Sequence, residues 1–127
     1  MRILFCSNYF THHQIPLSDA LYELTNHNYY FVAHKEMDAE RKNLGWGNDL
    51  ARPYTYSLTE QEVQEQLRDL DVLIVGSFPE SQTKKYSKKA KLFFRYSERP
   101  LKAGNPVLKY IPRFLKWHYY NPPWRKT

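Results

Sequence analysis

The chain has 127 residues, of which 42% are hydrophobic and 25% charged, a composition typical of one globular domain and not of a disordered segment. No apolar run reaches the roughly 20 residues that span a membrane, and residues 1–15 lack the features of a signal peptide. The single cysteine, Cys6, excludes a disulfide within the chain, so we expect a protein of the cytoplasm.

Charge is distributed unevenly along the chain. Residues 1–83 carry 6 Lys and Arg against 12 Asp and Glu, whereas residues 84–127 carry 13 Lys and Arg against one acid, Glu98. The net charge of +6 therefore comes entirely from the C-terminal third. A basic segment of this kind predicts an anionic partner, such as a membrane surface, a phosphorylated acceptor or a nucleic acid.

The N-terminal part predicts a strand followed by a helix. Residues 2–7 are a short apolar run typical of a buried strand. Thr11 and Gln14 fit a capping box, which predicts that the helix begins at Thr11 and that Pro16 kinks its first turns. Apolar residues then recur at helical spacing and predict the buried face of this helix: Leu17, Ala20, Leu21 and Leu24.

The rest of the chain repeats this alternation. Apolar runs predict further strands at residues 29–33, 54–58, 72–75 and 92–95. Helical patterns lie between them, at residues 36–44, after a capping box at Thr59 with buried Val63, Leu67 and Leu70, and at residues 82–90. A last helical pattern, Val107 to His118, has an apolar stripe flanked by Lys and Arg, which suits a membrane interface or packing against a neighbouring domain.

Apolar strands joined by helices predict an α/β fold, a Rossmann-like three-layer α/β/α arrangement with a mostly parallel sheet of about four to five strands. We assign residues 1–104 to this domain and residues 105–127 to a basic, aromatic helix and linker. Right-handed crossovers bring the C-terminal ends of parallel strands to one edge, and ligands bind beyond those ends. The functional loops are therefore expected at residues 8–14, 34–37, 76–80 and 96–99.

Two histidines, His12 and His13, lie in the first of these loops. At the opening of a helix, the positive end of the helix dipole disfavours imidazolium, and a neutral imidazole in a cleft can accept a proton. One of the two is therefore a candidate general base. The simpler alternative is that both are polar residues on an exposed first turn.

Other chemical signatures are missing from the sequence. The four glycines do not form a dinucleotide fingerprint or a phosphate-binding loop, and no group of His and Cys has zinc spacing. Asp69 and Asp71 resemble a metal-binding pair, but they lie at the edge of the sheet opposite the expected site. We therefore expect no metal.

Four stretches carry a family resemblance: RILFCSNYFTHHQIPLSDALYEL, AERKNLGWG, VLIVGSFPE and FFRYSERPLKAG. They resemble the N-terminal, acceptor-side domain of bacterial GT-B glycosyltransferases, of the kind similar to glycosyltransferase family 4. The likeness runs over nearly the whole chain and is most specific in SNYFTHHQIPLSDAL and YSERPLK.

The resemblance implies two Rossmann-like domains that face each other across a cleft. The N-terminal domain mainly receives the acceptor, and the C-terminal domain mainly binds a nucleotide-sugar donor, generally without a metal. His12 or His13 would be the base. The first loop, with Asn8, Tyr9 and Gln14, would line the cleft. The other loops that the topology selects add further candidate acceptor and cleft contacts: His34, Ser77, Glu98 and Arg99.

The chain stops at NPPWRKT, before the donor domain of such an enzyme. The resemblance therefore implies a fragment that is inactive alone and binds no cofactor itself, with the nucleotide-sugar donor belonging to the full-length enzyme. The implied partners are the missing donor-binding domain, a glycan or lipid-linked acceptor, and an anionic membrane at whose inner face the protein would sit.

The alternative is a non-catalytic basic α/β module that binds nucleic acid or an anionic membrane. In the basic segment, aromatic residues that can stack on bases are interleaved with cations: Tyr96, Tyr110, Trp117 and Tyr119. Of these partners, nucleic acid is the less expected.

Overall fold

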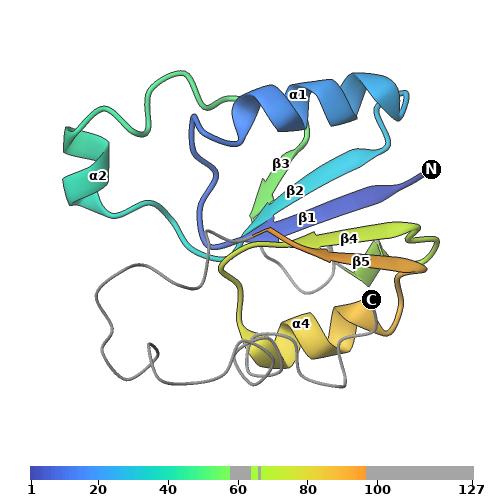
Figure 1. Ribbon diagram of the computed structural model, residues 1–127. Coiled ribbons are helices and arrows are strands. Elements are labelled where there is room, and N and C mark those ends of the chain that lie inside the picture. The colour runs from blue at the N-terminus through green and yellow to red at the C-terminus, as the bar shows by residue number, and fades with distance from the viewer. Residues whose placement is uncertain (58–63, 66, 97–127) are drawn as a thin grey trace, which may run out of the picture.

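The computed structural model describes residues 1–57, 64, 65 and 67–96, which form a sheet with helices packed around it (Figure 1). The strands are β1 (Ile3–Ser7), β2 (Tyr29–Ala33), β3 (Thr55–Ser57), β4 (Val72–Val75) and β5 (Leu92–Arg95). The helices are α1 (Ile15–Leu24), α2 (Ala39–Asn43) and α4 (Glu80–Ser87).

The five strands form one sheet in the order β3-β2-β1-β4-β5, and every neighbouring pair is parallel. The predicted parallel sheet of four to five strands is thus confirmed. The chain builds outward from β1 through β2 to β3, and then continues on the other side of β1 with β4 and β5. The strand order therefore reverses between β1 and β4, which is the position where open parallel sheets bind ligands.

Helices α1 and α4 cover opposite faces of the sheet, which confirms the three-layer arrangement (Figure 1). Successive residues of β1 alternate between the two faces: Ile3 and Phe5 pack on the side of α1, whereas Leu4 and Cys6 pack on the side of α4. All four are buried. A strand that is covered on both faces needs a continuous apolar run, which explains why this stretch was recognisable in the sequence.

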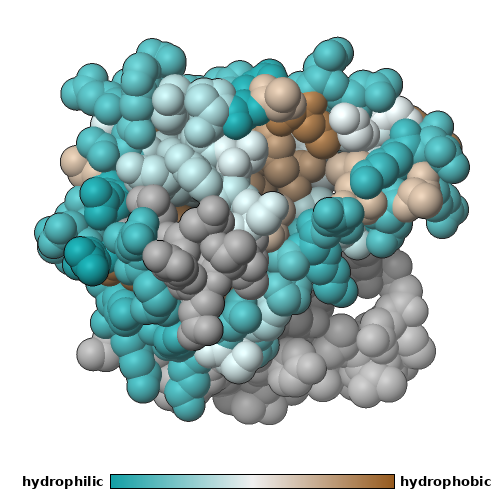
Figure 2. Space-filling view, turned by 180° about the vertical axis from the view of Figure 1, so that it is seen from behind, coloured by the Kyte–Doolittle hydropathy of each residue, from teal (hydrophilic) through white to brown (hydrophobic). Residues whose placement is uncertain are grey.

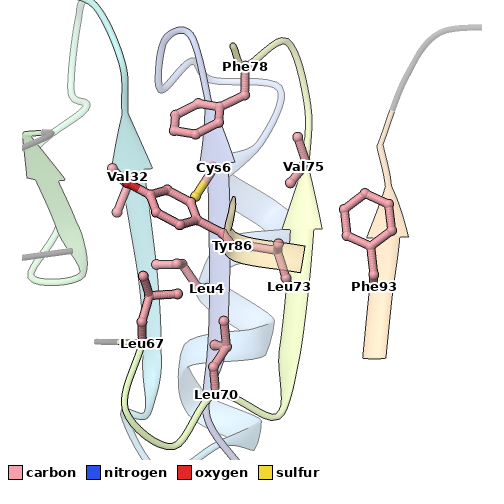
Figure 3. Close-up of a cluster of buried hydrophobic side chains, with 10 residues drawn as sticks. All are labelled: Leu4, Cys6, Val32, Leu67, Leu70, Leu73, Val75, Phe78, Tyr86 and Phe93. Atoms are coloured by element: carbon pink, nitrogen blue, oxygen red, sulfur yellow. The ribbon is translucent and has the colours of Figure 1, made fainter. Parts of the chain in front are cut away.

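Each face of the sheet has its own core. On the side of α4, Tyr86 reaches across the strands, and Phe78 closes the end of the cluster next to Cys6 (Figure 3). The members of this core are Leu4, Cys6, Val32, Leu67, Leu70, Leu73, Val75, Phe78, Tyr86 and Phe93. The core on the side of α1 is mostly aromatic: Ile3, Phe5, Phe10, Tyr29, Phe31, Tyr54 and Val72. On the face shown in Figure 2, a brown apolar area near the top lies among described residues that are mostly hydrophilic.

The predicted start of the first helix is wrong. Helix α1 begins at Ile15 and not at Thr11, and Pro16 lies in its first turn. A helix from Thr11 would place Pro16 in its interior, where the ring clashes with the carbonyl one turn earlier, whereas the first turn tolerates proline. The Gln14 side chain still reaches back as in a capping box, because its Oε1 accepts the Thr11 N–H at 2.6 Å. Pro16 therefore does not kink the helix.

The predicted buried face of this helix is correct only at Leu21, which packs against the core, and wrong at the other three residues. Leu17 and Leu24 are 40% and 80% exposed, and Ala20 is exposed. The face toward the sheet instead holds Ser18, which is fully buried with its hydroxyl 2.7 Å from the Tyr29 hydroxyl. The other residues on this face are Ile15, Leu21 and Tyr22. A buried polar pair fixes the rotation of the helix here, and apolar spacing does not show it.

The remaining boundaries differ only by short stretches. The second, fourth and fifth strands match the predicted ranges, whereas the third strand and the two helices α2 and α4 differ from theirs by a few residues. Leu67 and Leu70 are buried as predicted. Val63, the capping box at Thr59, the helical pattern from Val107 and the domain division after residue 104 lie outside the described residues. Among the helices that the structure describes, none is long and apolar enough to cross a membrane.

Candidate functional site

The segments that follow the strands meet at one edge of the sheet, as the topology predicts. Backbone hydrogen bonds continue the parallel pairing past the strand ends and hold these segments in register. Four of them, each 2.8 or 2.9 Å long, run from His34 N–H to Ser7 O, from Lys35 N–H to Asn8 O, from Gly76 N–H to Cys6 O and from Tyr96 N–H to Val75 O.

The ends of β1 and β4 approach each other closely at the point where the strand order reverses. A Cβ atom on Gly76 would lie 2.7 Å from Ser7 Oγ, so this approach needs a glycine. The Asn8 side chain is used within the loop, because its Oδ1 accepts the Tyr9 N–H at 2.9 Å and the Ser7 hydroxyl at 3.3 Å. Asn8 thus shapes the start of the loop between β1 and α1.

His34 follows β2 at the same edge. Its ring meets Phe78, in the loop after β4, at 5.7 Å between centroids and nearly perpendicular. The Nδ1 atom of His34 is buried and has no hydrogen-bond partner among the described residues. Buried polar atoms are normally paired, so this nitrogen is suited to bind a polar group from outside that part of the chain. Ser77, beside Phe78, is exposed.

His12 and His13 lie in the turn before α1, and both are exposed. Their ring centroids are 3.9 Å apart. Both imidazoles meet the indole of Trp46 edge to face, at 5.6 Å and 5.8 Å between centroids. Trp46 comes just after α2, which lies beyond the edge where the strands end (Figure 1). The segments after β1 and β2 are therefore in contact here.

The end of α2 explains how Trp46 reaches this position. Gly45 has a φ of +82°, the left-handed conformation that ends many helices. Gly45 N–H then donates to Lys42 O at 3.0 Å, and Trp46 N–H donates to Arg41 O at 3.1 Å. This pair of bonds is the Schellman motif, which turns the chain back on the helix. The sequence Gly45-Trp46-Gly47 therefore ends a helix and also places an indole.

Arg41 is the second residue that α2 contributes. Its guanidinium lies over the ring of Tyr9 at 5.1 Å and over the ring of Trp46 at 5.3 Å. Asp38 contacts two of these groups, because its Oδ2 accepts the Tyr9 hydroxyl at 3.1 Å and lies 3.9 Å from Arg41 Nε. The hydrogen bond to Asp38 raises the pKa of the Tyr9 phenol. We call this group the Trp46 cluster: Tyr9, His12, His13, Asp38, Arg41 and Trp46.

The structure thus places the predicted site residues in different surroundings. Tyr9, His12 and His13 belong to the Trp46 cluster, whereas Asn8, His34 and Ser77 lie near the junction of β1 and β4. Gln14 is engaged with Thr11, from whose hydroxyl it also accepts a hydrogen bond at 2.8 Å. Glu98 and Arg99 lie outside the described residues. Sequence reasoning missed three members of the cluster: Asp38, Arg41 and Trp46.

No group of three or more His, Cys, Asp or Glu side chains within the described residues is placed to hold a metal ion. Comparisons of the chain with protein families, with curated proteins and with solved structures give no match.

Proposed function

We propose that this chain is the acceptor-side domain of a GT-B glycosyltransferase, which moves a sugar from a nucleotide-sugar donor to a glycan or glycolipid acceptor. The observation that carries the proposal is the position of His12 and His13. They follow β1, beside the reversal of strand order, and contact an indole that the next loop supplies. A second domain facing this edge would hold the donor.

The chemistry of sugar transfer fits exposed imidazoles at such an edge. The acceptor hydroxyl oxygen forms the new bond to the sugar, the bond from the sugar to the nucleoside diphosphate breaks, and the hydroxyl proton passes to a base. An imidazole within hydrogen-bond reach of that hydroxyl can take the proton. Neither His12 nor His13 spends a ring nitrogen on a hydrogen bond within the described residues, so each can serve an acceptor.

The test is acceptor-dependent release of nucleoside diphosphate. The gene, with any coding sequence that follows the Thr127 codon, is expressed, and the product is incubated with a panel of nucleotide sugars and of glycan and lipid-linked acceptors. We expect release that needs the acceptor and that falls at least about 100-fold in one of the variants His12→Ala and His13→Ala.

His27→Ala is the matched control, because His27 is also exposed but follows α1 at its other end, stacked on Tyr22. Its turnover should equal that of the wild type. Absence of release with every donor would refute the glycosyltransferase proposal. Normal turnover in both His12→Ala and His13→Ala would refute only the assignment of the base.

A second candidate function is a basic module that binds nucleic acid or an anionic membrane. It is favoured by the charge of residues 84–127, of which the described part exposes five lysines: Lys84, Lys85, Lys88, Lys89 and Lys91. Binding of a single-stranded oligonucleotide with a steep loss at higher salt would support this candidate. Absence of binding in the same anisotropy assay, even at low salt, would refute this candidate.

A further inference from the structure

The proposed reaction uses the imidazoles but leaves Arg41 unexplained. Its guanidinium is held by three contacts, with the rings of Tyr9 and Trp46 and with Asp38. These contacts restrict its orientation while 43% of the side chain remains exposed. An arginine that is fixed in this way loses less conformational entropy when it binds a ligand.

The hydrogen-bond donors of Arg41 are available. Within the described residues, no hydrogen bond uses a guanidinium N–H of Arg41, and the Asp38 oxygen at 3.9 Å is too distant for one. The planar fork of an arginine matches the oxygens of a phosphate or carboxylate group with two parallel hydrogen bonds. Asp38, in contrast, already accepts the hydroxyl of Tyr9 and so orients the cluster.

The neighbours of Arg41 distinguish between these two anions. His12 and His13 contact the same indole as the guanidinium does. A carboxylate has two oxygens, which the arginine fork alone can satisfy, whereas a phosphate has further oxygens for an imidazole N–H. The arrangement of one fork and two imidazoles around one ring therefore favours phosphate.

We propose that the Trp46 cluster binds a phosphate group of the acceptor, with Arg41 as its main ligand and one of the two imidazoles as a second ligand. The other imidazole is then free to act as the base. That the phosphate belongs to the acceptor rests on the proposed function, whereas the binding of phosphate by the cluster does not. The group can come from a sugar phosphate or from a lipid headgroup.

Binding is measured on the full chain by nuclear magnetic resonance, following the indole N–H signal of Trp46, which Trp46→Phe identifies. The probes are inorganic phosphate, a hexose phosphate, and vesicles of phosphatidylcholine with and without phosphatidic acid. We expect a saturable shift with inorganic phosphate. A response to the hexose phosphate that is stronger than the response to inorganic phosphate identifies a sugar phosphate as the source. A stronger response to the vesicles that contain phosphatidic acid identifies a lipid headgroup.

Variants separate binding by the fork from simple charge. Arg41→Gln should lose the response, and Arg41→Lys, which keeps the charge but not the fork, should weaken it at least about tenfold. Arg68→Gln is the control, because it removes the same charge at a different place. Arg68 is exposed and precedes β4 at the opposite edge of the sheet. This variant should bind phosphate like the wild type. Thermal unfolding of each variant shows that loss of binding is not loss of folding.

The result that overturns the inference is a folded wild type without a saturable phosphate shift, or an Arg41→Gln variant that binds as tightly as the wild type. In either case the cluster would only connect the two loops. Phosphate binding without any sugar transfer would leave the site standing and refute the proposed function. Transfer that Arg41→Gln does not change would leave the proposed function standing and would refute the assignment of the acceptor phosphate to the Trp46 cluster.

Discussion

Ser7 and Gly76 are in direct contact where β1 and β4 end. A methyl group on Gly76 would lie 2.7 Å from Ser7 Oγ and 3.2 Å from Ser7 Cβ. Ser7 is only 3% exposed, and its hydroxyl donates to Asn8 Oδ1, so its side chain has little room to turn away. The spacing of the two strands at the reversal of strand order therefore depends on the missing side chain of Gly76.

Gly76→Ala is expected to lower the free energy of unfolding by about 1–3 kcal/mol, because the added methyl group must push the ends of β1 and β4 apart. Urea unfolding followed by circular dichroism measures the loss. Ser7→Ala in the same chain should recover part of it, since the nearer of the two clashing atoms is then gone.

Gly47→Ala is the matched control for this prediction. A Cβ at Gly47 would meet Lys42 Cγ at 3.5 Å and Met37 Sδ at 3.9 Å, which are ordinary van der Waals distances. We expect this variant to change stability by less than about 0.5 kcal/mol. Equal losses in Gly47→Ala and Gly76→Ala would show that the close approach at Ser7 is not limiting.

Leu24→Ala tests the rotation of α1 against the apolar pattern of the sequence, and Leu73→Ala is the reference for a buried leucine. Leu24 is 80% exposed, whereas Leu73 in β4 is fully buried. Leu73→Ala should cost about 2–5 kcal/mol of unfolding free energy, because it leaves a cavity in the core. Leu24→Ala should cost less than about 0.5 kcal/mol. A loss at Leu24 as large as that at Leu73 would restore the predicted buried face.

The sheet could be predicted from the sequence because its three inner strands, β1, β2 and β4, are apolar on both faces. The ranges of β2, β4 and β5 agree with the predicted ones, and the run of β1 agrees within a residue. Parallel pairing then follows from the alternation with helices, and it fixes which edge collects the loops. These features are local in sequence or follow from chirality, so they need no knowledge of individual side-chain contacts.

The rotation of α1 and most of the Trp46 cluster could not be predicted in the same way. The rotation depends on the hydrogen bond between Ser18 and Tyr29, two polar groups that an apolar pattern ignores. The cluster depends on contacts between distant residues, such as the hydrogen bond from Tyr9 to Asp38. One local signal was present: Gly45 after a helix with Arg41 and Lys42 in its last turn is typical of a Schellman turn, which folds the next residue back.

Asp71 gives the stability a predictable dependence on pH. Its Oδ1 accepts Lys91 Nζ at 2.6 Å, and its Oδ2 accepts the Arg2 N–H at 2.8 Å. The bond from Lys91, and then the bond from Arg2, lower the pKa of Asp71 below its ordinary value of 3.8, and the same ion pair raises the pKa of Lys91 above 10.5.

Because the pKa of Asp71 is lower in the folded than in the unfolded chain, Asp71 stabilises the fold at pH values above its unfolded-state pKa. This contribution is lost as the pH falls through its folded-state pKa. The raised pKa of Lys91 adds stability below 10.5 that is lost at higher pH. The wild type should therefore exceed Asp71→Asn in urea midpoint by a constant amount from about pH 5 to 9, and by less toward about pH 3.

Glu36→Gln is the control for this pH series, since Glu36 is an exposed carboxylate in the segment after β2. Its midpoint should follow that of the wild type at every pH. If the difference between the wild type and Asp71→Asn stayed the same down to pH 3, the ion pair with Lys91 would contribute nothing that depends on the charge of Asp71.

Cys6 is expected to be inert to thiol reagents in the folded protein. Its sulfur is fully buried within the core on the side of α4 (Figure 3), and burial raises the pKa of the thiol. Reaction with an aromatic disulfide reagent needs an accessible thiolate, so labelling should require unfolding of the sheet. In urea, one equivalent should react, because Cys6 is the single cysteine. Without urea, Cys6 should be labelled faster in Gly76→Ala than in the wild type, whereas Leu24→Ala should be labelled at the wild-type rate. Rapid labelling of Cys6 in the native wild type would contradict the buried position of β1.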